Sequence, residues 1–113
     1  MQSVKIVNCK YPLKFNYYAN DDGSIYSEIS HKTLNYQLDK DGYAKVQLMS
    51  TDGKRHRYSV HRLILENFFP IENMKMMQVN HIDGNKTNNR LENLEWVTAS
   101  ENCSHKYKIG LAS

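Results

Sequence analysis

Histidine and amide side chains gather in the second half of the sequence, in an order that suits metal-assisted hydrolysis. His81 ends a short predicted strand, and Asn102 and His105 follow it on a predicted helix, three positions apart and therefore on one helix face. Neutral imidazole and amide oxygens can hold a divalent cation, and a helix N-terminus favours an anion such as phosphate. A histidine base beside a metal and a phosphate is the chemical equipment for phosphodiester hydrolysis.

The elements that must position these residues are a strand, a polar loop, a second strand and a helix. Residues 78–81 and 94–97 have the pattern of short strands, and the span between them is rich in turn residues. Thr98 and Glu101 form a capping box, which predicts a helix starting there. Asn93 lies just before the second strand, where an amide side chain can tie two backbone segments together.

The first half of the chain predicts a small antiparallel sheet. Residues 43–48 alternate with period two, so that one face of this strand points to the core. Residues 61–69 have a helical pattern that Pro70 ends. Three Asp-Gly pairs separate the short segments and favour hairpins: they are Asp22-Gly23, Asp41-Gly42 and Asp52-Gly53. The predicted fold class is therefore α+β.

Composition restricts the class of protein. The chain has 113 residues with 15 Lys and Arg against 12 Asp and Glu, which fits one domain or two very small units sharing a core. It has no apolar run long enough to span a membrane and no signal-peptide pattern. Its two cysteines are expected to be free thiols in a reducing, cytoplasmic compartment. The excess positive charge lies in residues 54–113, and its sign suits nucleic acid.

Three segments hold a motif with several fixed spacings at once: VHRL at 60–63, VNHIDGNKTNNRLENLEWVT at 79–98, and EN at 101–102. This motif resembles that of the HNH endonucleases of phages and mobile introns. The resemblance extends more weakly over residues 24–60, which are similar to the small sheet module that precedes the nuclease motif in homing enzymes. It implies a ββα-metal unit in residues 73–113, preceded in residues 1–72 by an antiparallel sheet with one helix that docks DNA.

The resemblance also implies a role for each residue of the motif. His81 would be the general base that takes a proton from the attacking water. Asn102 would be a metal ligand, and Asn93 a structural amide that fixes the loop. Asn80 occupies a second ligand position, where related enzymes often carry Asp, so that a ligand charge is lost. His105 is a further candidate ligand. One Mg²⁺ or Mn²⁺ per site would complete the centre.

Three questions stay open on the sequence alone. Strand alternation points Asn80 and His81 to opposite faces, so both reach one metal only if the strand twists or ends there. Asp83 is a possible substitute carboxylate, although a turn role in its Asp-Gly pair is the better interpretation. His61 begins a helix and is interpreted either as a packing residue or as a phosphate contact.

Double-stranded DNA is the expected partner, bound by a monomer or a homodimer with no membrane involved. The expected location is the cytoplasm, which is that of the host cell if a phage encodes the chain. Six basic residues are the predicted phosphate contacts: Lys54, Arg55, Arg57, Arg62, Lys86 and Arg90. A single site cuts one strand per engagement, so a monomer is expected to nick DNA. The alternative is a DNA-binding module that keeps the fold but has lost efficient catalysis. A structural zinc protein is the third hypothesis, and the two cysteines argue against it because they lie far apart in the sequence.

Overall fold

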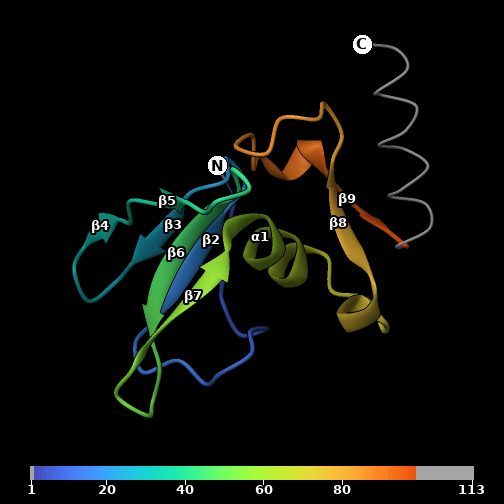
Figure 1. The fold of residues 1–113 in the computed structure, drawn as a ribbon. Coiled ribbons are helices and arrows are strands. Elements are labelled where there is room, and N and C mark those ends of the chain that lie inside the picture. The colour runs from blue at the N-terminus through green and yellow to red at the C-terminus, as the bar shows by residue number, and fades with distance from the viewer. Residues whose placement is uncertain (1, 99–113) are drawn as a thin grey trace.

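Three small antiparallel sheets surround one helix in the computed structural model, which describes residues 2–98 (Figure 1). The first sheet has the strand order β1-β2-β3-β4 and the second β5-β6-β7. Their strands are β1 (Ser3–Lys5), β2 (Tyr17–Asn20), β3 (Ile25–Ser27), β4 (Lys32–Thr33), β5 (Gln37–Leu38), β6 (Ala44–Met49) and β7 (Arg55–Ser59). Every pairing within these sheets is antiparallel, as the three Asp-Gly turns predict.

The glycines of all three predicted Asp-Gly turns have positive φ angles, which is the turn conformation that these pairs indicate. Gly23 between β2 and β3 and Gly53 between β6 and β7 have φ angles of +90° and +82°, which side chains other than glycine adopt only with strain. The predicted strand at 43–48 is β6, shifted by one residue. Strand β1 was not predicted, because three residues are too few for their alternation to indicate a strand, and they are held by pairing along β2.

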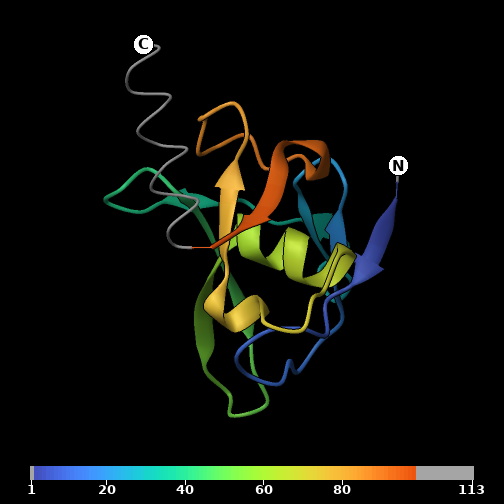
Figure 2. The same cartoon turned by 90° about the vertical axis from the view of Figure 1, so that its right-hand side faces the viewer.

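Helix α1 (Val60–Phe68) lies between the first two sheets on one side and a third, two-stranded sheet on the other (Figures 1 and 2). It matches the predicted helix within one residue at each end. Its buried side chains (Val60, Leu63, Ile64 and Leu65) recur at helical spacing and fill the centre of the molecule.

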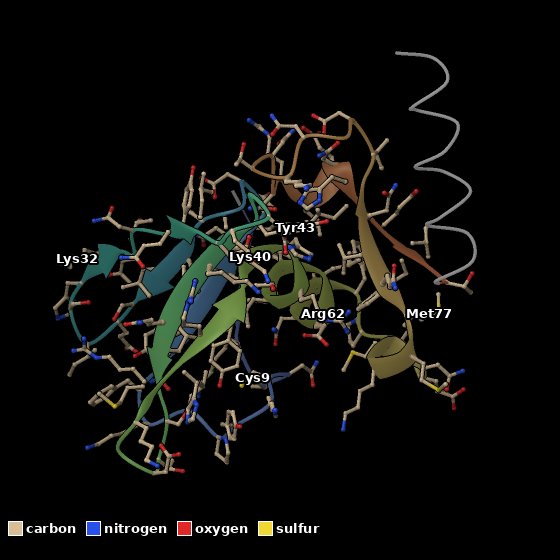
Figure 3. The ribbon with its side chains drawn as sticks, viewed as in Figure 1. Cys9, Lys32, Lys40, Tyr43, Arg62 and Met77 are labelled. Carbon is tan, nitrogen blue, oxygen red and sulfur yellow. The ribbon has the colours of Figure 1, made fainter. Side chains whose placement is uncertain are left out.

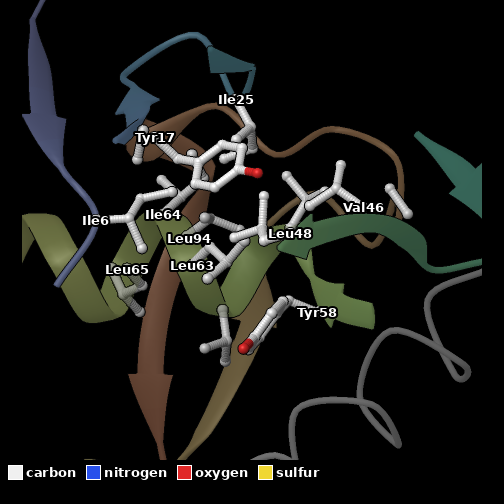
Figure 4. Packing of buried hydrophobic residues seen from close by; sticks show 14 residues of the cluster. Ile6, Tyr17, Ile25, Val46, Leu48, Tyr58, Leu63, Ile64, Leu65 and Leu94 are labelled. Carbon is white, nitrogen blue, oxygen red and sulfur yellow. The ribbon is translucent and has the colours of Figure 1, made fainter. Parts of the chain in front are cut away.

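One hydrophobic cluster joins the two units that the sequence predicts (Figure 4). Ile6, Ile25 and Leu48 come from the first part of the chain, whereas Val79 and Leu94 come from beyond residue 72. Because α1 packs against both groups, the sheets and the third hairpin share a core. The division of the chain into units at residues 1–72 and 73–113 stays a prediction from the sequence.

The third sheet is the hairpin of β8 (Gln78–His81) and β9 (Leu94–Val97), and both strands have the predicted bounds. Short 3-10 helices precede each strand, namely η1 (Met74–Met76) and η2 (Leu91–Asn93). The α+β class, with small antiparallel sheets followed by this hairpin, is confirmed. The helix predicted after Thr98 lies outside the described residues. Within residues 2–98 no helix has the length and apolarity to cross a membrane.

Candidate active site

His81 is the last residue of β8 and is buried, with 6% of its surface exposed. Its Nε2 atom lies 2.8 Å from Oδ1 of Asn89, which is also buried. The imidazole of His61 contacts the ring edge-on at a centroid distance of 5.0 Å, and the Tyr43 ring lies 6.1 Å away. Three elements far apart in sequence therefore enclose the predicted base: β8, the start of α1 and the hairpin before β6.

Asn93 ties together the two ends of the loop at residues 82–93, called the hairpin loop from here on. Its Oδ1 accepts a hydrogen bond from the Asp83 backbone N–H at 3.0 Å. Its Nδ2 donates to Oδ1 of Asp83 at 3.0 Å and to the Asn88 carbonyl at 2.8 Å. The side chain is buried, so these bonds are shielded from water. Asn93 was expected to fix the loop between the two strands, and these hydrogen bonds hold the loop in this way.

Asp83 also serves the hairpin loop. Its Oδ1 accepts from the Asn85 N–H at 2.8 Å, and its Oδ2 accepts from Nδ2 of Asn88 at 2.8 Å. Hydrogen bonds from the Asn88 side chain, the Asn85 backbone and the Asn93 side chain hold the pKa of this carboxyl below its ordinary value. Both carboxylate oxygens are thus engaged within the loop, which supports the turn interpretation of Asp83 over the metal-ligand one.

Asn80 faces away from His81, as strand alternation requires. Its side chain is half-buried, and its Nδ2 donates to Oε1 of Glu95 at 3.0 Å across the β8–β9 pair. The sequence analysis did not name Glu95 as a site residue, although its position opposite Asn80 follows from the register of the hairpin.

Within residues 2–98 no group of three or more His, Cys, Asp and Glu side chains could hold a metal ion. The other predicted ligands, Asn102 and His105, lie outside the described residues.

His61 packs beside the predicted base as a neutral ring. Its Nδ1 is buried and has no hydrogen-bond partner among the described residues. Burial is the main cause that lowers its pKa to about 3, and the nearby charges of His81, Lys45 and Arg62 act in the same direction. A ring with this pKa is uncharged at neutral pH, so it adds no positive charge next to His81.

The chain is similar in sequence and fold to known proteins. A sequence model of the HNH endonuclease family matches residues 58–103. The HNH endonuclease L245 of Acanthamoeba polyphaga mimivirus is 39% identical over 93 residues, which are 82% of this chain and 28% of that protein. The DNA endonuclease I-HmuI of Bacillus phage SP01 is 38% identical over 95 residues, which are 84% of this chain and 53% of that protein.

A solved structure of the HNH homing endonuclease I-HmuI, concerned with its DNA binding and cleavage, matches the whole described fold. The TM-score is 0.81 at 35% identity, and the match covers 97% of this chain and 60% of the other. The chain belongs to the HNH endonuclease family. The resemblance predicted from the motif is thereby confirmed. The chain spans only 28% and 53% of the length of the two relatives named above.

The hairpin of residues 78–97, called the HNH hairpin from here on, contacts the second sheet through Lys86, one of the predicted DNA contacts. Nζ of Lys86 donates to the Asp41 carbonyl at 2.8 Å and lies 4.8 Å from the centre of the Tyr43 ring. Tyr43 itself lies 5.2 Å from the His61 ring, on the side of α1 where the hairpin loop approaches (Figure 3). Lys86 therefore helps to hold the β5–β6 turn against the active site.

Basic side chains gather in a cleft of about 460 Å³ between the first two sheets, called the basic cleft from here on. Arg55 and Arg57 line it as exposed residues of β7, together with Lys32 and Lys45, which the sequence did not indicate. Its lining contains no Asp or Glu. The cleft is therefore a concave surface with the charge that phosphate groups require.

The remaining predicted phosphate contacts lie elsewhere on the surface. Lys54 is exposed at the turn before β7, beside Arg55. Arg90 is exposed in the hairpin loop, where its Nε lies 3.3 Å from Oε1 of Glu92. Both side chains are exposed and therefore accessible to a nucleic acid.

Arg62, one of the predicted phosphate contacts, makes several contacts within the protein. Its guanidinium group donates to the backbone carbonyls of Met74 and Met77 at 2.7 and 2.9 Å and to Oε2 of Glu66 at 3.0 Å. It also lies over the Trp96 ring, 5.4 Å from the ring centre. Figure 3 shows Arg62 directed from α1 toward the segment of Met77. Its donors fasten α1 to the segment that leads into β8, which gives Arg62 a structural role.

Proposed function

We propose that this chain is a metal-dependent DNA endonuclease that hydrolyses phosphodiester bonds, with His81 as its general base. The observation that supports the proposal best is the environment of His81. The residue ends β8, its ring is buried, and its Nε2 is held by Asn89. A base must be oriented before it can act on a water molecule, and this ring is oriented by contacts on two sides.

In the proposed reaction the nitrogen of His81 that Asn89 does not hold takes a proton from a water molecule. The oxygen of this water forms the new bond to phosphorus, and the bond to the departing 3′ oxygen breaks. A bound divalent cation would stabilise the charge that develops on the phosphate and on the leaving oxygen. Neutral His61 excludes water from one face of the base without repelling a protonated His81.

The donors near the HNH hairpin suit a hard cation. With its Nδ2 held by Glu95, Asn80 directs its amide oxygen away from that carboxylate. Glu95 supplies a negative charge next to the position where relatives often carry Asp. Amide and carboxylate oxygens are ligands that Mg²⁺ and Mn²⁺ accept. We propose Asn80 as a ligand, together with Asn102 and His105 from the part of the chain beyond the described residues.

Double-stranded DNA is the proposed substrate. Arg55 and Arg57 in the basic cleft and Lys54 beside it lie on the sheet module, whereas Arg90 lies in the hairpin loop. A duplex that contacts both regions would bring its backbone to the HNH hairpin. The relative I-HmuI is a DNA endonuclease, and we propose the same activity for this chain.

We further propose that the chain acts in the cytoplasm, as a monomer that nicks one strand or a homodimer that cuts both strands.

The test of the proposed activity is conversion of supercoiled plasmid into open circles by the purified chain. Conversion is expected with Mg²⁺ or Mn²⁺ and none with EDTA. Cleavage that persists in EDTA would contradict the metal requirement. Retarded migration of DNA without any cleavage, in every metal tried, would favour the second candidate.

The second candidate is a DNA-binding module with weakened catalysis, and the neutral Asn80 is the observation in its favour. The variant Asn80→Asp distinguishes the two. In this variant two carboxylates face each other across β8 and β9, so a bound cation should stabilise it more than the wild type. A large increase in nicking from near zero would indicate a weakened enzyme or a binder. Little change would indicate that Asn80 is already an adequate ligand or is not a ligand.

A measurement without DNA supports this test. The shift of the unfolding temperature on adding Mn²⁺ should increase in Asn80→Asp. The double variant with Glu95→Gln is the matched control, because it restores a single charge at the pair. A shift that is the same in all three proteins would exclude this pair from the metal site.

A further inference from the structure

Asn89 determines which nitrogen of His81 carries the proton. The oxygen of an amide accepts hydrogen bonds and cannot donate one. Because Oδ1 of Asn89 lies 2.8 Å from Nε2 of His81, Nε2 must be the donor of this bond. In a neutral ring the lone pair is then on Nδ1. The bond is shielded from water, since both side chains are at most 6% exposed.

The turn between β2 and β3 holds Asn89 in place from a distant part of the sequence. At Gly23 a Cβ atom would lie 2.7 Å from both the carbonyl carbon and the carbonyl oxygen of Asn89, which is too close for any side chain. The backbone N–H of Leu91 also donates to the Asp21 carbonyl at 2.8 Å. The first sheet therefore touches the residue that holds the base, and a glycine permits that approach.

We propose that Asn89 is a positioning residue that fixes the Nε2–H tautomer of His81, and that the Gly23 turn keeps Asn89 in this position. Nδ1 is then the atom that accepts the proton of the attacking water. This catalytic consequence rests on the proposed nuclease function, whereas the tautomer is a property of the resting protein. The sheet module thus supports the active site in addition to its proposed contact with DNA.

The tautomer can be measured without any activity. Two-bond ¹H–¹⁵N correlation spectra of the ¹⁵N-labelled chain distinguish Nε2–H from Nδ1–H, with His81→Gln identifying the signal. The spectra are recorded without metal at about pH 8.5, where an ordinary histidine is neutral. The wild type is expected to show Nε2–H. Asn89→Asp, which keeps an acceptor oxygen, should retain it, and Asn89→Leu, which keeps the size only, should show a mixture. An Nδ1–H signal in the wild type would overturn the proposal.

Gly23→Ala tests the turn without changing any polar group of the site. Gly53→Ala is its matched control, because Gly53 has nearly the same positive φ and a Cβ there would have no atom within 4 Å. Both variants bear the same backbone strain, but only Gly23→Ala displaces Asn89. We expect Gly53→Ala to nick DNA as the wild type does, and Gly23→Ala to show a kcat about tenfold to hundredfold lower at unchanged KM. Equal kcat values in the two variants would overturn the role of the turn.

The outcomes separate this inference from the proposed function. A wild type that never cleaves DNA, but has a single Nε2–H tautomer that Asn89→Leu replaces with a mixture, would refute the nuclease and support the positioning role. A wild type that cleaves DNA, with Asn89→Leu cleaving at the same kcat, would refute the positioning role and support the nuclease.

Discussion

The hairpin loop and the basic cleft are both rich in polar residues, but they are built in opposite ways. In the loop the polar side chains bind one another: Asn93 binds both ends of the loop, Asp83 accepts from three neighbours, and Asn89 holds His81. In the cleft, Arg55 and Arg57 extend from β7 as exposed side chains. The hairpin loop fixes the orientation of the His81 ring, whereas the basic cleft provides positive charge for phosphate groups.

This difference implies two kinds of response to mutation. Hydrogen bonds that share partners act together, so removing one member of the loop network leaves other buried groups unsatisfied. Exposed cations act on phosphate through largely independent terms, so their removal should lower DNA affinity in additive steps.

Asn93→Ala should produce the largest change in stability. It removes three hydrogen bonds and leaves the Asp83 N–H and the Asn88 carbonyl without this partner. We expect the free energy of unfolding to fall by about 2–4 kcal/mol, measured by urea denaturation. Asn35→Ala, at an exposed amide outside the loop, is the control and should change it by less than about 0.5 kcal/mol. Equal effects of the two variants would mean that the loop is not a cooperative network.

Neutralising the basic cleft should leave the fold intact and weaken DNA binding. For the double variant Arg55→Gln and Arg57→Gln, the slope of log affinity against log salt should decrease in magnitude by about 2, with an unchanged unfolding temperature. A double variant of Lys5→Gln and Lys75→Gln removes the same charge at exposed positions that do not line the cleft. A slope that changes equally in both proteins would assign DNA binding to net charge instead of the cleft.

His61 should make stability depend on pH, with a smaller effect. The unfolded chain protonates this residue near pH 6.5, whereas the folded chain does so only near its pKa of about 3. Between these values the unfolded state binds more protons, so stability falls as the pH is lowered. We expect a loss of about 2 kcal/mol between pH 7 and pH 5 that is absent in His61→Phe. Parallel curves for the two proteins would show that His61 is accessible to protons in the fold.

The contrast between the two regions also explains which features could be predicted from the sequence. Asp-Gly pairs, strand alternation and the spacing of His81 and Asn93 are local patterns, and they predicted the hairpins and the HNH unit. The role of Asn89 depends on a turn that is more than sixty residues away in the sequence, which no local pattern reveals. Arg62 was predicted as a DNA contact because its charge is visible in the sequence, whereas the carbonyls of Met74 and Met77 that bind it are not.

We propose His81, fixed in the HNH hairpin, as the general base of a metal-dependent nuclease. The most direct test compares the wild type, His81→Ala and His31→Ala in the nicking of supercoiled plasmid with Mg²⁺ or Mn²⁺. His31 is an exposed histidine outside the site and serves as the control. We expect His81→Ala to lower the nicking rate by at least about 100-fold while it still binds DNA, and His31→Ala to cleave at the wild-type rate. Nicking by His81→Ala at the wild-type rate would contradict the account.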